Sequence, residues 1–243
     1  MRTFGILTRL VIWDVKLQAR ENVYLFTVLT TLTFCVFIWL LPDRAPDTVV
    51  TGVLFLDPAV VGTSFVAAIV LTERSQNTLV ALAVSPVRPS DYVLSKIITL
   101  TLLTFAGGMA LVYAAYYPVP LDQAIRFIIA MAFTGTLGVV GGVLLVATAN
   151  SMNHFIARAF PVSVVLYLAF LAHFDVVKGV WVWILLGLNP GHAMLRSLLW
   201  AADPSNISTA EAIYAFGYMG LLIAAFFVWA LRLYRDNIAR SAT

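Results

Sequence analysis

Charge is scarce in this sequence. Of 243 residues, 15 are Lys or Arg and 12 are Asp or Glu, so 11% are charged while 61% are hydrophobic. Soluble domains are about a quarter charged. Cys35 is the single cysteine and cannot form an intrachain disulfide. These shortages exclude a water-soluble globular domain, a disordered chain, a nucleic-acid binder and a disulfide-stapled module. With a mean hydropathy of +0.94, the chain has a lipid bilayer as its solvent.

Catalytic patterns are missing as well. The sequence holds no Ser-His-acid order, no HExxH or GxSxG motif and no GxxxxGK[ST] phosphate loop. Its three histidines, at positions 154, 173 and 192, are far apart and have no Cys or acid at ligand spacing. We therefore predict no catalytic residue, no metal site and no cofactor in this chain. By itself it is not an enzyme.

Long stretches without charge predict an all-α integral membrane protein with one domain, residues 1–243. A helix crosses the hydrocarbon core with about 20 apolar residues. Five stretches qualify as spans: 23–41, 53–72, which only Asp57 interrupts, 97–117, 127–149 and 212–231. Residues 160–172 are short for a span and are interpreted as the fifth of six in chain order. The outer segment 173–211 is predicted to be broken or re-entrant. It contains a short helix from Asn189 to Trp200 on or in the membrane interface, and Ser208 and Glu211 have capping-box spacing before the last span.

Residues 1–21 have the pattern of a helix that lies in the plane of the membrane surface. Four basic residues fall on one stripe of a helical wheel, and apolar residues lie away from it. A plain cytosolic extension is the alternative. Asp14 and Gln18 lie off the basic stripe at i, i+4 spacing, which would let them face protein.

The basic residues also give an orientation. If both termini are cytoplasmic, eleven Lys and Arg lie inside and four outside. We therefore predict a multi-pass protein of the cell's inner (plasma) membrane with both termini in the cytoplasm.

Two features inside the spans have alternative explanations. Asp57 and Pro58 fit an N-cap and N1 residue near the outer surface, while a substrate or proton site is the other interpretation of Asp57. Gly138 and Gly142 form a GxxxG pair, which allows close helix packing, either within one subunit or between subunits.

The loop between the second and third spans, residues 73–96, is the most informative segment. Leu79, Leu82, Ala83 and Pro86 follow i, i+3, i+4, i+7 spacing. This pattern predicts a short amphipathic helix across the cytoplasmic end of the bundle. Such a helix can be an elbow or a contact for a soluble partner.

This loop resembles that of the six-span permeases of type-2 ABC exporters, in the order and spacing of Glu73, Arg74, Thr78, Leu79, Ser85, Pro86 and Lys96. The pieces Leu56-Asp57-Pro58 and Leu94-Ser95-Lys96 look most like the drug (fluoroquinolone-type) exporter branch. Asn77 stands in place of the family's Gly, and Val80 in place of its Glu. Homodimer and heterodimer therefore both stay open.

The resemblance implies a permease subunit that exports amphipathic or drug-like cargo. Separate ABC ATPase subunits would supply ATP and Mg, and a second permease, either self or homologous, would complete the path among membrane lipids. Glu73 and Arg74 would anchor the coupling helix, and Lys96 would reach the headgroup level. The residues expected at the ATPase contact are Glu73, Arg74, Thr78, Leu79, Leu82, Val84 and Pro86.

Four aromatic residues are candidates for the translocation path, although lipid-facing or core positions are the alternative. They are Phe65, Phe160, Tyr167 and Phe170. The segment from Val180 to Trp200 would serve as an outer gate. Export of lipid, polysaccharide or peptide, and a membrane scaffold without transport activity, are the alternative functions.

Overall fold

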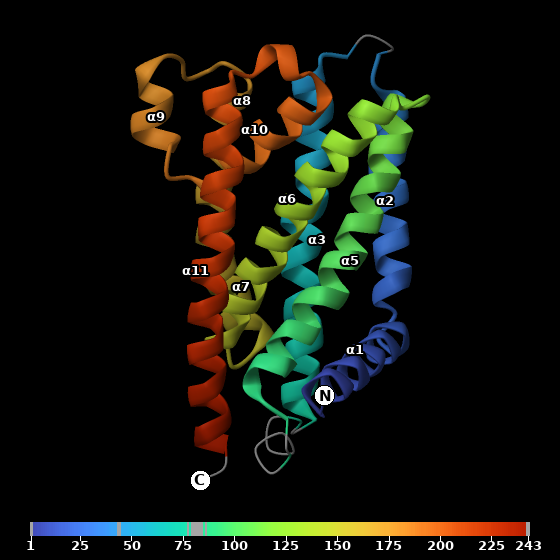
Figure 1. The fold of residues 1–243 in the computed structure, drawn as a ribbon, viewed down its shortest axis with the longest axis vertical. Coiled ribbons are helices and arrows are strands. Elements are labelled where there is room, and N and C mark those ends of the chain that lie inside the picture. Colours follow the sequence, from blue (N-terminus) through green and yellow to red (C-terminus); the bar gives the residue numbers. More distant parts are fainter. Residues whose placement is uncertain (1, 43–44, 77, 79–84, 86, 242–243) are drawn as a thin grey trace.

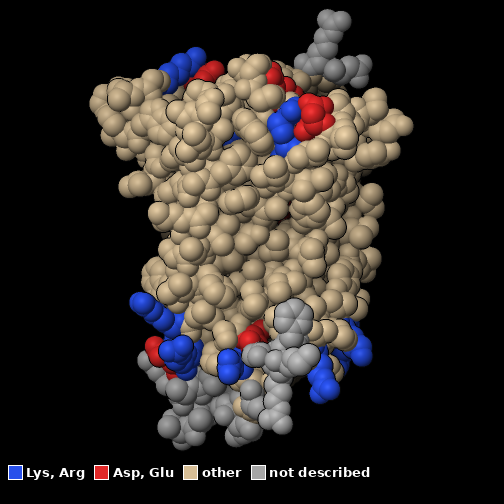
Figure 2. Space-filling model, viewed as in Figure 1, with Lys and Arg blue, Asp and Glu red and all other residues tan. Residues whose placement is uncertain are grey.

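The structure is a computed structural model that describes residues 2–42, 45–76, 78, 85 and 87–241, with side chains throughout except at 2–4, 58–61 and 237–241. The described residues form helices and no strand, which confirms the all-α prediction. On the face shown in Figure 2, charged side chains gather in two bands at opposite ends, and the zone between them carries none. This is the distribution expected of a chain that crosses a bilayer.

Six helical segments of the described chain are long and apolar enough to cross a membrane. They are α2 (Val23–Leu40), α3 (Asp47–Ser75), α5 (Pro89–Tyr116), α6 (Leu121–Ala147), the segment Met152–His173, which contains α7 (Met152–Tyr167) and α8 (Phe170–His173), and the first 28 residues of α11 (Thr209–Ser241). Both termini lie at one end of the bundle (Figure 1). We call this end the base and the opposite end the apex.

Helix α1 (Arg2–Arg20) runs across the base before the chain turns into α2 (Figure 1). Asn22 makes this turn with a left-handed backbone, φ 58°, a conformation that Asn tolerates better than most residues. Asp14 and Gln18 are buried against the bundle, as the helical wheel predicts, and Trp13 is exposed on the other side.

The core consists mainly of two layers, one near the base and one near the apex. Val93, Val143 and Tyr234 belong to the base layer, and Phe55 and Leu198 belong to the apex layer. Helices α3, α5 and α6 each contribute several buried side chains to both layers and are the most buried spans, so these three helices are the centre of the bundle. Much of α2 faces outward.

The GxxxG pair packs within the chain. A Cβ on Gly142 would lie 2.9 Å from the Cα of Thr63, and a Cβ on Gly62 would lie 3.4 Å from the carbonyl carbon of Gly138. These two glycines of α6 therefore allow α3 to approach at backbone distance. The structure supports the intrasubunit interpretation of the pair.

The predicted cap at Asp57 is wrong. Helix α3 begins at Asp47, after Pro46, and Asp57 lies almost three turns inside it. The proline that follows Asp57 is tolerated because transmembrane helices accommodate interior prolines. Asp57 is fully buried, and neither of its carboxylate oxygens has a hydrogen-bond partner in the described part of the chain.

The segment between the fifth and sixth spans is broken as predicted, into α9 (Val180–Leu186), α10 (Pro190–Ala202) and a 3-10 turn (Pro204–Asn206). The Asn189 side chain accepts from the N–H of Gly191, 2.8 Å, and caps α10. Ser208 and Glu211 form the reciprocal capping box before α11. Helix α10, predicted to lie on or in the membrane interface, has its small and apolar residues buried among α3, α6 and α11.

Candidate functional site

The most polar buried site lies at the base, where α1, α3 and α5 meet. The Lys96 ammonium of α5 contacts the Asp14 carboxylate of α1 and lies 2.5 Å from Glu73 Oε1 of α3. All three residues are at most 4% exposed. Two hydroxyl groups complete the site: Tyr92 donates to Glu73 Oε2, 2.6 Å, and Ser95 donates to Asp14. We call these five residues the Lys96 cluster.

The Lys96 cluster holds two carboxylates and one ammonium, so it contains one excess negative charge when all three groups are ionised. Burying unpaired charge is costly, and hydrogen bonds to each carboxylate reduce that cost. The Tyr92 ring adds a cation–π contact, because the Lys96 ammonium lies 5.1 Å from its centroid. The three helices are thus joined by polar contacts that cannot be exchanged for water without opening the base.

Lys96, predicted to reach the headgroup level, makes its contacts within the protein. Its side chain is directed into the protein, where the ammonium is paired with two buried carboxylates. Gln18 strengthens the same junction, since its amide donates to Thr99 Oγ1 at 2.8 Å. The Tyr24 hydroxyl donates in turn to the side-chain oxygen of Gln18, Oε1, at 3.1 Å. Helix α1 is therefore held to α5 by two polar side chains, one turn apart.

Arg74 makes a second connection, from α3 to the end of α6. Its guanidinium donates to the carbonyl oxygens of Ala147, 3.1 Å, and Ala149. Arg158 of α7 donates to the carbonyl of Thr148 between them. The last carbonyls of a helix have no intrahelical donor and carry partial negative charge, so two cations satisfy them here. Tyr234 of α11 stands beside Arg74, with the guanidinium 6.0 Å from its ring.

The predicted coupling loop begins directly after Arg74. Glu73 and Arg74 belong to the last turn of α3, and Lys96 belongs to the second turn of α5. Thr78 is half-buried in helical backbone. The predicted contact residues Leu79, Leu82, Val84 and Pro86 lie outside the described residues. Any force applied to the loop would reach the Lys96 cluster through both ends of the loop.

A comparison with protein-family models identifies the family to which the chain belongs. Residues 44–232 match the model of the ABC-2 family transporter proteins. The chain belongs to the ABC-2 family. The match covers α3 to most of α11, and it leaves α1 with Asp14 outside. No curated protein matches the chain.

Membership in the ABC-2 family makes the chain a transmembrane permease subunit of an ABC transporter. It is a multi-pass membrane protein and not a catalytic enzyme by itself. Membership also implies association with an ABC ATPase. Glu73 and Arg74, with the loop that follows them, are accordingly the residues to examine for contact with such a partner.

The four aromatic candidates for the translocation path do not form one surface. Tyr167 and Phe170 lie together around Phe55, with ring centroids 6.2 Å and 5.5 Å from it. Phe65 packs against the base layer of the core, and Phe160 is 70% exposed on α7. Within one subunit, only Tyr167 and Phe170 are brought together.

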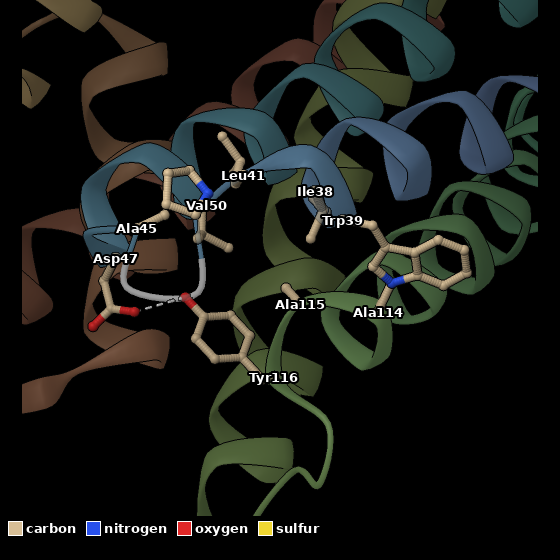
Figure 3. Close-up of a pocket in the computed structure, with 10 residues that line it drawn as sticks. Ile38, Trp39, Leu41, Ala45, Asp47, Val50, Ala114, Ala115 and Tyr116 are labelled. Carbon is tan, nitrogen blue, oxygen red and sulfur yellow. Dashed lines mark hydrogen bonds between the residues drawn. The ribbon is translucent and has the colours of Figure 1, made fainter.

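The apex carries two polar cavities. One, of about 410 Å³, lies among α2, α3 and α5, and there the Tyr116 hydroxyl donates to the Asp47 carboxylate at 3.0 Å (Figure 3). The other, of about 470 Å³, is lined by His173, Asp175 and Arg196. Among the described residues no three His, Cys, Asp or Glu side chains are grouped as metal ligands would be.

His192 lies near the second cavity's Arg196 and is buried. Burial, with Arg196 on the next turn of α10, lowers the pKa of His192 to about 4. The imidazole therefore stays neutral at physiological pH. Its ring packs edge-on against Trp183, with centroids 5.9 Å apart. These contacts indicate that His192 has a structural role in packing α10 against the rest of the protein.

Sequence reasoning missed the partners inside the Lys96 cluster. Glu73 and Lys96 were expected to act separately. They are 23 residues apart and precede and follow the predicted loop, so both lie at the base end of their helices. Tyr92 and Lys96 are one turn apart on α5, so a cation and a hydroxyl face the same side. The position of Asp14, off the basic stripe of α1, was the available signal for the third partner.

Proposed function

We propose that the chain is the membrane-spanning subunit of an ABC exporter that moves amphipathic or drug-like molecules out of the cytoplasm. Separate ATPase subunits would bind ATP and Mg, and a second permease would complete the path. Both termini and the loop 76–88 would face the cytoplasm in the inner membrane. Eleven inside Lys and Arg against four outside support this orientation.

The observation that carries the proposal is the Lys96 cluster beside the loop. An ATPase closing against the loop has to transmit its motion to the spans. Buried ion pairs at the junction of α1, α3 and α5 would make these helices move together rather than bend separately. The bond from Arg74 to the end of α6 would extend the motion to a fourth helix.

The direct test is co-purification with an ABC ATPase subunit expressed beside the chain, followed by ATP-dependent efflux of a fluorescent amphipathic dye from vesicles. The variant Glu73→Ala/Arg74→Ala/Leu82→Asp is expected to lose both the complex and efflux. Arg9→Ala, which changes an exposed base-end cation, is the control. Full retention of complex and efflux in the triple variant would overturn the coupling role.

A finer variant separates coupling from binding. Glu73→Gln keeps a hydrogen-bonding side chain next to Tyr92 but removes the charge that Lys96 contacts. We expect the ATPase complex to persist while dye efflux per ATP hydrolysed falls. ATP-dependent movement of lipid, polysaccharide or peptide instead of the dye would reassign the cargo. Absence of any vectorial activity would favour a scaffold.

A further inference from the structure

A groove of about 330 Å³ runs along the outer side of the bundle between α2 and α5. Its walls are side chains of α2 from Tyr24 to Cys35 and of α5 from Leu103 to Ala110. The exposed side chains Val28 and Leu32 form its outer rim, so the groove opens toward the bilayer. Its volume is at the lower end of the range of ligand pockets, roughly 300–1,000 Å³.

Three oxygen atoms at or directly behind the floor of this groove have no partner in the described part of the chain. They are both carboxylate oxygens of Asp57 and the hydroxyl oxygen of Thr31, all buried and without a hydrogen bond in the described part of the chain. In a helix, a threonine hydroxyl usually bonds the carbonyl one turn earlier, as Thr27 does to Val23 at 2.9 Å. Thr31 makes no such bond, and its hydroxyl is left for another partner.

Gly107 brings these oxygens to the groove. The position at which a Cβ of Gly107 would lie is 3.1 Å from Thr31 Oγ1 and 3.2 Å from Asp57 Oδ2. Gly107 itself lines the groove. Any larger residue would cover the two oxygens, whereas glycine leaves only its own backbone between them and the groove. The carboxylate of Asp57 therefore lies directly behind the groove floor.

The depth of the site makes these unpaired atoms significant. Asp57 is ten residues from the apex end of α3, and Thr31 and Gly107 are each nine residues from the apex end of their helices. At 1.5 Å per residue this is about 14 Å below the apex, within the hydrocarbon core. Acidic side chains at that depth are rare, and each is a candidate functional residue by default.

We propose that this groove binds an organic monocation, a primary or secondary ammonium on an apolar body, that enters sideways from the bilayer. The apolar walls would hold the body of the ligand, and Asp57 with Thr31 would accept hydrogen bonds from the ammonium. A cation supplies what the floor lacks, namely opposite charge and donors, whereas a neutral lipid chain supplies neither. Asp57 is fully buried, so a ligand can reach its carboxylate only if α2 moves slightly away from α5. Such a movement is feasible because only 28% of the residues of α2 are buried inside the protein.

The groove carries its own reporter, because Cys35 is the only cysteine in the chain and lines the groove. The full chain is reconstituted in nanodiscs without an ATPase, so that a failure here is independent of the proposed export function. The rate of Cys35 alkylation by N-ethylmaleimide is measured with 4-phenylbutylammonium and, separately, with the uncharged 4-phenylbutanol. Retention of the tritiated amine gives its affinity directly.

We expect the amine, but not the alcohol, to slow Cys35 alkylation in the wild-type chain. Asp57→Asn should weaken amine binding roughly tenfold or more, since one partner of a buried charge pair is lost. Asp57→Glu should restore part of it, and Gly107→Leu should abolish protection by covering the oxygens. Asp122→Asn removes the same charge at an exposed position and should change nothing.

Three results would overturn the proposal: equal binding of amine and alcohol, amine binding unchanged by Asp57→Asn, or formation of a Cys35–Cys35 disulfide between chains in oxidised membranes. The last would show that a second copy covers the groove. If Asp57→Asn does not fold, the comparison of amine with alcohol on the wild-type chain and on Thr31→Val still decides, because Thr31→Val keeps volume and should weaken only amine binding.

Discussion

The ammonium of Lys96 lies 2.5 Å from Glu73 Oε1, although the two residues precede and follow the loop 76–88 in the sequence. The same ammonium contacts Asp14 of α1. One buried cation thus fixes the distance between the two ends of the predicted ATPase-binding loop and attaches the N-terminal helix to both. This junction resists separation of α3 from α5.

Lys96→Met should be strongly destabilising. Removing the cation leaves two buried carboxylates without their counter-ion, which typically costs about 3–5 kcal/mol. The free energy of unfolding in mixed detergent micelles, followed by circular dichroism, measures the loss. Lys16→Met changes an exposed lysine of α1 and should be nearly neutral. Equal stability of the two variants would contradict the buried pairing.

Combining substitutions tests the pair itself. In Lys96→Met/Glu73→Gln, one of the two uncompensated charges is also removed, so the double variant should be more stable than Lys96→Met alone. Additive losses, with no coupling beyond about 0.5 kcal/mol, would mean that Lys96 and Glu73 do not interact.

Arg74→Lys should also destabilise the chain, although the charge is kept. A guanidinium reaches the two carbonyls at Ala147 and Ala149 with separate N–H groups, and the single ammonium of lysine cannot reproduce this fork. We expect a loss of about 1–3 kcal/mol in the same unfolding measurement. Arg88→Lys, at an exposed position directly before α5, is the matched control.

Adjacent glycines in α6 offer a test of packing. A Cβ on Gly142 would meet the backbone of Thr63 at 2.9 Å, whereas a Cβ on Gly141 would meet nothing within 4 Å. Gly142→Ala should therefore cost about 1–3 kcal/mol through overpacking. Gly141→Ala should be neutral or stabilising by up to about 1 kcal/mol, because alanine favours helix more than glycine. Equal effects in thermal unfolding would contradict the close contact of α3 with α6.

The spans were predictable because a bilayer imposes one simple rule, a charge-free run long enough to cross it. The structure has the predicted spans, but α5 and α6 begin at Pro89 and Leu121, earlier than the predicted starts at 97 and 127, because charged residues also occupy their first two turns. The exception is α3, where the charge of Asp57 was taken as a helix start. In a membrane an acid can also sit inside a helix when neighbouring helices cover it, and sequence periodicity does not report that cover.

The Lys96 cluster could be predicted only in part. Glu73, Arg74 and Lys96 were identified from their order along the chain, but their partners depend on how α1 docks and on which way the Lys96 side chain turns. A lysine near a span end can extend to the headgroups or bend into the protein. The direction of the Lys96 side chain depends on the carboxylate of Asp14, which lies on α1, 82 residues earlier in the sequence.

Stability should depend on pH through His192. Its pKa is about 4 in the folded chain because of burial, and 6.5 is its ordinary value. Between these values the unfolded chain binds more protons at this site, so stability is fully present above pH 6.5 and falls as pH drops toward 4, by up to about 3 kcal/mol. Arg196 and His173 oppose protonation and Glu211 favours it.

Because carboxylates titrate in the same window, the measurement has to be a difference between variants. His192→Phe keeps an aromatic ring between Trp183 and Tyr214 but cannot be protonated. The wild-type chain should lose more stability than His192→Phe between pH 6.5 and 4, and the two curves should run parallel above pH 7. His154→Phe, at an exposed histidine, should follow the wild-type curve. If the curves of the wild-type chain and His192→Phe were parallel over the whole range, the imidazole of His192 would be protonated as easily in the folded chain as in the unfolded one. That result would contradict the burial of His192 in the folded chain.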